Sequence, residues 1–208
     1  MPRVSTAFKE DRRIEILDAA RRCVARSGFH QASMQEICTE AGMSPGNLYR
    51  YFPSKEAIIA GIAERDRAEV GAQLAAASFT EDFFGTFAAL SRYHLVERSA
   101  DDVGLCAEIM AESRRNPVIG RITQDFDADV RARLATTLRA AAERGDIRAG
   151  VDFEGVVTMI MVMADGVWWR RAADPAFNAE AILPVFLDLV RHMLLSAPAE
   201  KNNAGAKS

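Results

Sequence analysis

The residues with the clearest chemical character lie between Ser33 and Lys55. Apolar side chains recur there at spacings that would pack two short helices against each other. The outward positions of the second helix begin with small residues and continue with polar and aromatic ones, namely Ser44, Pro45, Gly46, Asn47, Tyr49, Arg50 and Tyr51. A helix that is small at its N-terminus can approach base edges closely, and its free amide groups favour phosphate oxygens. The pattern predicts a surface for duplex DNA.

Capping signals predict the first of these short helices over about Met34–Ala41. Ser33 and Glu36 have the spacing of a capping box, in which each side chain accepts from the backbone amide of the other residue. Gly42 ends the helix, because glycine adopts a positive φ at little cost.

The second short helix is predicted from Pro45 to about Phe52, with Ser44 at the N-cap. A longer helix over about Glu10–Ser27 precedes the pair and ends at Gly28. Two short helices joined by a glycine-containing turn form a helix-turn-helix. Ser54 is expected to cap a fourth helix.

The remaining chain also has helical periodicity, with no alternating strand pattern. Its helices are expected near residues 81–98, 102–114, 117–144, 153–172 and 179–196. The segment Val156–Ala164 is apolar on every side, which predicts burial between the core and a second subunit. The expected fold is therefore all-α, with a three-helix helix-turn-helix head and a larger helical-bundle body that also forms a subunit interface.

The distribution of charge agrees with a DNA-binding head. The whole chain has a formal charge of −3, but residues 1–55 carry +3 and the remainder −6. We find no nucleophile elbow, phosphate loop, metal motif or cofactor fingerprint, so no enzyme, metal or cofactor is expected. The three cysteines are interpreted as buried apolar residues in a reducing cytoplasm, and no membrane segment is expected.

Over residues 10–60 the sequence resembles the TetR/AcrR family of bacterial transcriptional regulators. The resemblance is carried by a fixed order of residues: Ile37, Gly42, Ser44, Leu48, Tyr49, Tyr51, Phe52 and Lys55. It implies base contacts from Gln35 and Pro45–Asn47, and phosphate contacts from Ser33, Tyr49, Tyr51 and Lys55. Ser44 is also placed near DNA, whereas Arg50 is either a DNA contact or a solvated charge.

The resemblance also implies a domain layout and an assembly. We expect a DNA-binding domain over residues 1–55, a ligand-binding and dimerisation domain over 56–198, and a mobile tail over 199–208. In this family the final two helices pair with those of a second subunit in a four-helix bundle. A homodimer presents two heads, so a palindromic operator is expected.

The interior of the predicted body is rich in methionine and aromatic residues, which suits a pocket for a small lipophilic effector, although ordinary core packing has the same composition. The acidic Glu108 and Asp165 lie in apolar stretches and are candidates for a cationic ligand. The full set of candidate ligand-binding residues is Phe87, Glu108, Met110, Phe126, Met163, Asp165, Trp168 and Trp169. The resulting hypothesis is a repressor released by a small effector; the alternative is a regulator whose body is controlled by a protein partner.

Overall fold

A computed structural model describes residues 6–196, so the tail predicted at 199–208 lies outside the described residues. Every regular element in this part of the chain is a helix. In chain order these are α1 (Thr6–Gln31), α2 (Met34–Glu40), α3 (Pro45–Tyr51), α4 (Lys55–Ala77), α5 (Phe83–Arg92), the π-helix η1 (Tyr93–Glu97), α6 (Ala100–Ser113), α7 (Pro117–Arg144), α8 (Phe153–Ala173) and α9 (Ala179–Leu195). The expected all-α fold is confirmed.

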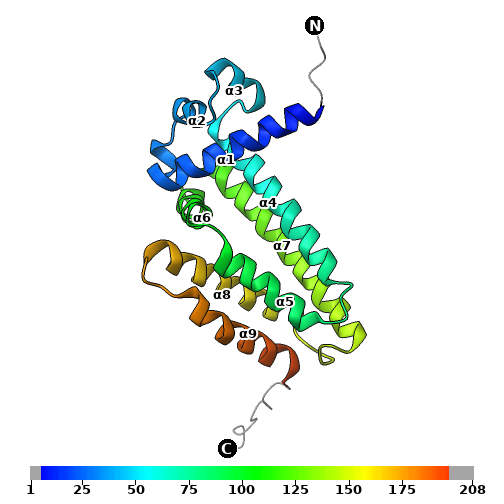
Figure 1. Cartoon of the computed structure of the whole chain (residues 1–208). Helices are drawn as coiled ribbons and strands as arrows, with labels where there is room; N and C mark the ends of the chain where they lie inside the picture. Colours follow the sequence, from blue (N-terminus) through cyan, green and yellow to red (C-terminus); the bar gives the residue numbers. More distant parts are fainter. Residues whose placement is uncertain (1–5, 197–208) are drawn as a thin grey trace, which may run out of the picture.

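The helices form a head and a body that share two long helices (Figure 1). Helices α1, α2 and α3 make the head, while α4 and α7 run side by side from the head into the body. Helix α6 lies directly beneath α1, and α8 and α9 pack together at the far end of the body. None of the helices described for residues 6–196 has both the length and the apolar character required to cross a membrane.

Local capping sets the limits of the head helices, as the sequence predicts. The Glu36 amide donates to the Ser33 hydroxyl at 3.1 Å, and the Ala57 amide donates to Ser54 at 3.2 Å. The reciprocal half of the predicted capping box is wrong, because the Glu36 carboxylate is engaged elsewhere. It accepts from Arg26 at 3.0 Å and from Ser27 at 3.1 Å, which ties α2 to the end of α1.

Helix α1 bends sharply at Gly28, where φ is +79°. The prediction that the first helix ends at a left-handed Gly28 is confirmed for the regular helix, and a further helical turn after the kink reaches Gln31. A left-handed backbone at this position favours glycine because it has no Cβ. The bend brings Phe29 into the core of the head, where its side chain is buried.

Two groups of buried apolar residues stabilise the molecule. The first fills the head, but it also includes Leu105 of α6 and Ile119 of α7, so residues beyond the head complete its core. The second runs through the body from Leu74 in α4 to Leu194 in α9. The head is thus packed onto the body and is not a separate globule on a linker.

The body departs from the sequence prediction at one element. A single helix was expected over residues 81–98, but the chain forms α5 and then the π-helix η1. The Arg98 amide donates to the Tyr93 carbonyl at 3.1 Å, which closes the wider π-helical turn. Periodicity cannot reveal such a turn, since it adds only one residue to an otherwise helical pattern.

Candidate nucleic-acid interface and internal cavity

The predicted DNA-binding residues gather on the outer side of α2 and α3. Seven of them are exposed: Ser33, Gln35, Ser44, Pro45, Gly46, Tyr49 and Arg50. Three others, Asn47, Tyr51 and Lys55, are half-buried. Tyr51 also packs against the core of the head, so only part of its surface faces outward. Most of the predicted contacts are therefore exposed on, or at the start of, two consecutive helices.

The N-terminal end of α3 is open to close approach. A Cβ atom added at Gly46 would meet no atom within 4 Å, so this position faces free space. Ser44 occupies the N-cap position with an extended backbone, but within residues 6–196 its hydroxyl forms no capping hydrogen bond. The hydroxyl is consequently available to an external acceptor or donor.

The structure gives Lys55 contacts within the protein, whereas the family resemblance implies a phosphate contact. Its ammonium group donates to the backbone carbonyls of Phe29 and Ala32, the latter at 2.9 Å. It also lies 4.3 Å from the centre of the Phe29 ring. Burial lowers the pKa of Lys55. These contacts fasten the start of α4 to the end of α1, and a phosphate contact would have to compete with them.

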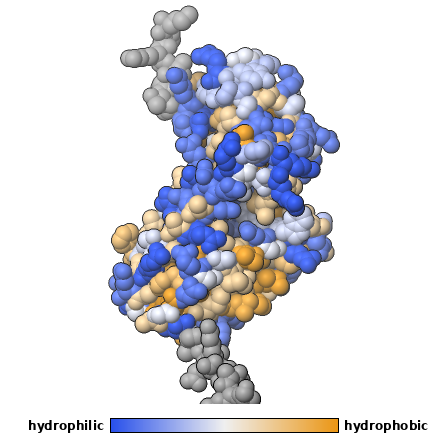
Figure 2. Space-filling model, turned by 180° about the vertical axis from the view of Figure 1, so that it is seen from behind, coloured by the Kyte–Doolittle hydropathy of each residue, from blue (hydrophilic) through white to orange (hydrophobic). Residues whose placement is uncertain are grey.

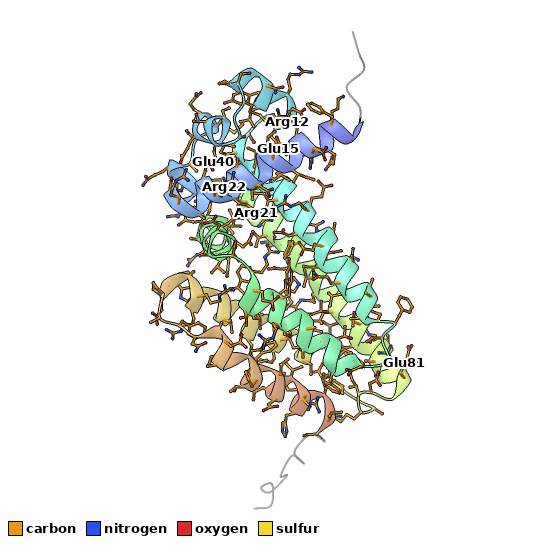
Figure 3. All side chains as sticks on the ribbon, in the orientation of Figure 1. Arg12, Glu15, Arg21, Arg22, Glu40 and Glu81 are labelled. Atoms are coloured by element: carbon orange, nitrogen blue, oxygen red, sulfur yellow. The ribbon has the colours of Figure 1, made fainter. Side chains whose placement is uncertain are left out.

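The arginines of α1 are largely neutralised by carboxylates of the head (Figure 3). Arg12 pairs with Glu15, and Arg22 donates to Glu40 at 2.7 Å. Arg26 pairs with both Glu36 and Glu40. Glu15, Glu36 and Glu40 are already counted in the net charge of +3 for residues 1–55, so these pairs leave that charge unchanged but engage the three arginines within the head.

A cavity of about 350 Å³ lies inside the body, between helices α4, α5, η1, α6, α7 and α8. Its lining is mostly apolar. Five of the predicted ligand-binding residues line it: Phe87, Met110, Phe126, Asp165 and Trp168. Burial raises the pKa of Asp165, and the nearby negative charge of Asp127 raises it further. The cavity therefore combines an apolar wall with carboxyl groups on α7 and α8.

The other three predicted residues, Glu108, Met163 and Trp169, lie outside this lining. The Glu108 carboxylate instead accepts from the Phe29 amide at 2.9 Å and so joins α6 to the bend in α1. Trp169 is 56% exposed, whereas its neighbour Trp168 lines the cavity. Successive residues of an α-helix are turned by about 100° from each other, so the two tryptophans cannot both face the cavity.

Several polar residues that the sequence analysis did not select also line the cavity. Arg21, Asp66, Arg98 and Asp102 meet at the end nearest the head, while His94 lies 2.6 Å from the side-chain oxygen of Gln73. Burial lowers the pKa of His94, and the charge of Arg98 lowers it further. Arg21 pairs with residues 45 and 81 positions away, a separation at which the sequence carries no pairing signal.

Comparisons with known proteins agree over nearly the whole chain. Residues 16–62 match the family described as bacterial regulatory proteins, tetR family, and residues 90–195 match the BetI-type transcriptional repressor C-terminal family. The Escherichia coli K12 regulator UidR is 31% identical over 159 residues, which cover 74% of this chain and 79% of UidR. The structure of Salmonella enterica GusR superposes with a TM-score of 0.78 at 27% identity, covering 93% of this chain and 99% of GusR.

A more distant structure shares the fold with a ligand bound. Bacillus subtilis FadR in complex with stearoyl-CoA superposes with a TM-score of 0.74 at 20% identity, covering 85% of this chain and 96% of FadR.

The contacts of Lys55 lead to a prediction about stability. Lys55→Met removes a charged donor from two backbone carbonyls, so we expect the free energy of unfolding to fall by about 1–3 kcal/mol. Urea unfolding followed by circular dichroism measures the change. The control, Arg50→Met, removes an exposed charge from α3 and should change stability by less than about 0.5 kcal/mol. Equal stability of Lys55→Met and the parent protein would show that the ammonium group does not hold α1 to α4.

Proposed function

The chain belongs to the TetR family of bacterial regulatory proteins, and on that premise we propose that it is a repressor controlled by a small lipophilic effector. Membership makes it a DNA-binding transcriptional regulator and not an enzyme. The further proposal is that a homodimer binds a palindromic operator and leaves it when the effector enters the body. The observation that carries it is the largely apolar cavity of about 350 Å³ directly beneath the head. As a regulator of chromosomal genes, the protein would act in the cytoplasm.

The exposed surface of α2 and α3 supports a division of the DNA contacts into two classes. We assign Gln35 and the segment Pro45–Asn47 to base contacts, because a recognition helix enters the major groove with its N-terminal residues next to the bases. Ser33, Ser44, Tyr49 and Tyr51 carry hydroxyl groups suited to phosphate oxygens. Arg50 is exposed near the end of the same helix and is assigned to the phosphate backbone.

This division predicts different effects for two substitutions. Gln35→Ala should weaken the preference at one base pair by about 1–3 kcal/mol if the amide contacts a base edge. Tyr49→Phe should weaken binding to every sequence alike, because it removes a phosphate contact. Fluorescence anisotropy on a high-affinity duplex selected from a random library, and on its single-base variants, measures both. A uniform loss of affinity for Gln35→Ala would place Gln35 on the backbone instead.

The surface of α8 and α9 supports a homodimer. Seven large apolar residues of these helices are between 38% and 56% exposed in the single chain: Met159, Val162, Trp169, Ile182, Val185, Leu189 and Leu195. Figure 2 shows apolar surface gathered over the body, whereas polar surface dominates around the head. A contiguous apolar surface of this kind is typical of a subunit interface, and two antiparallel helices from each subunit can form a four-helix bundle.

The proposed interface can be tested by placing one charged side chain in it. Leu189→Glu would bury an unpaired carboxylate between subunits, so we expect it to dissociate the dimer or unfold it. Val118→Glu is the matched control, since Val118 is 43% exposed on α7 and lies outside the proposed interface. Analytical ultracentrifugation gives the molecular mass of each variant. A folded, monodisperse Leu189→Glu dimer would contradict an interface through α9.

Effector control predicts that occupancy of the cavity and release from DNA occur together. In Trp169→Phe the remaining tryptophan, Trp168, lines the cavity and should report a bound molecule by its emission. Titration with a panel of lipophilic compounds should give at least one that alters this emission and lowers operator affinity over the same concentration range. Compounds that change the emission without changing operator affinity would indicate a cavity without regulatory function. Absence of any binding would favour control of the body by a protein partner.

A further inference from the structure

Four charged side chains from different elements form an ion cluster at the end of the cavity nearest the head. The ion cluster consists of Arg21 of α1, Asp66 of α4, Arg98 after η1 and Asp102 of α6. Arg21 pairs with Asp66, and its second terminal nitrogen lies 2.5 Å from Asp102. Arg98 lies 3.2 Å from Asp102 and 3.7 Å from Asp66. All four residues line the cavity.

Because the ion cluster is buried, the loss of any one ion pair has a large energetic cost. The side chains of Arg21 and Arg98 are only 8% and 11% exposed. Ion pairs attract more strongly where water is excluded, and removing one partner leaves a buried charge uncompensated. Among residues 6–196, Arg21 forms ion pairs with Asp66 and Asp102 alone, and its Nε has no hydrogen-bond partner. Arg21 therefore has no alternative carboxylate if the ion cluster opens.

The ion cluster is also connected to α8, a helix that contributes residues to the cavity wall. Arg171 of α8 donates to the carbonyls of Leu95 and Arg98, at 3.1 Å and 2.7 Å. These carbonyls lie at the end of η1, and π-helical turns frequently occur at functional sites. Residues of α4, α6, α8 and η1 thus surround one end of the cavity and hold Arg98 against the two aspartates.

Arg21 is the only member of the ion cluster that belongs to the head. Figure 3 shows it on the side of α1 that faces the body, at the junction with α4 and α6. A thin apolar layer accompanies it, because Ile59, Ile62 and Leu105 belong both to the core of the head and to the cavity wall. A change in the shape of the cavity therefore acts directly on side chains that belong to the core of the head.

We propose that this ion cluster is the element through which occupancy of the cavity controls the position of the DNA-binding head, with Arg21 as the coupling residue. The proposal rests on the proposed effector function and specifies how the same site is regulated. A molecule that fills the cavity displaces Asp66 or Arg98, and Arg21 follows its carboxylates because it has no other partner. Helix α1 then shifts, and in a dimer the spacing of the two α3 helices no longer fits successive major grooves.

The chain provides a matched control for Arg21. Arg65 of α4 pairs with Asp18 of α1 at 2.7 Å, so it also joins these two helices. This pair is 33% and 44% exposed and does not line the cavity. Arg65→Gln therefore breaks an ion pair between the same helices without touching the ion cluster.

The test fills the cavity in two independent ways. One is the neutral fluorescent probe N-phenyl-1-naphthylamine. The other is Ala164→Phe, which adds a ring from α8 at a position that lines the cavity. Operator affinity is measured by anisotropy for each occupant in the parent protein, in Arg21→Gln and in Arg65→Gln. Asp66→Asn, which keeps the shape of the side chain, provides a second variant of the ion cluster if Arg21→Gln does not fold.

We expect each occupant to lower operator affinity by about tenfold or more in the parent protein and in Arg65→Gln. In Arg21→Gln or Asp66→Asn the same occupants should change operator affinity by less than about twofold, although probe fluorescence shows that the cavity still binds. Equal loss of affinity in all backgrounds would overturn the coupling role of Arg21 and leave effector control intact. No loss in the parent protein with either occupant would instead overturn effector control itself.

Discussion

The head of this protein cannot close its own hydrophobic core, and the rest of the structure depends on that constraint. Helices α2 and α3 have seven residues each, which is too short to be stable without tertiary packing. Their buried residues pack on α1 and α4, and the core is completed by Leu105 and Ile119 from the body. The orientation of the DNA-facing surface is therefore determined by how the head packs on α6 and on the start of α7.

Hydrogen bonds and ion pairs fix the position of the head relative to the body. At the bend of α1, the Phe29 amide donates to Glu108 of α6, while Lys55 binds the Phe29 and Ala32 carbonyls from α4. Before the bend, Arg21 of α1 joins the same two body helices. Apolar packing alone tolerates small sliding movements, whereas hydrogen bonds and ion pairs fix one register. The head is held at both points by α4 and α6 together, the helices that also wall the cavity.

The sequence predicted features that depend on neighbouring residues and missed those that depend on distant ones. Caps at Ser33 and Ser54 are local, so α2 and α4 begin where expected. The partners of Lys55, 26 and 23 residues earlier, could not be inferred, and Lys55 was therefore predicted only as a phosphate contact. Cavity residues were selected by composition, which cannot distinguish Trp168 from Trp169 because the rotation of α8 is set by packing. The family resemblance supplied the class of function, but no contact between head and body.

Joining two parts of a protein through a buried ion cluster carries a desolvation cost, and this cost is evidence about the role of the cluster. Replacing buried ion pairs by well-packed apolar residues is often neutral or stabilising, so stability alone does not explain Arg21 beneath the head. An apolar contact weakens gradually as surfaces separate, whereas a guanidinium held by two carboxylates is either paired or left with an uncompensated charge. Such an element has two discrete arrangements, and a ligand needs only to interact differently with each to shift the population between them. The ion cluster lines the cavity and includes Arg21 of α1. A ligand that interacts differently with its two arrangements would therefore have its largest effect on the head at this position.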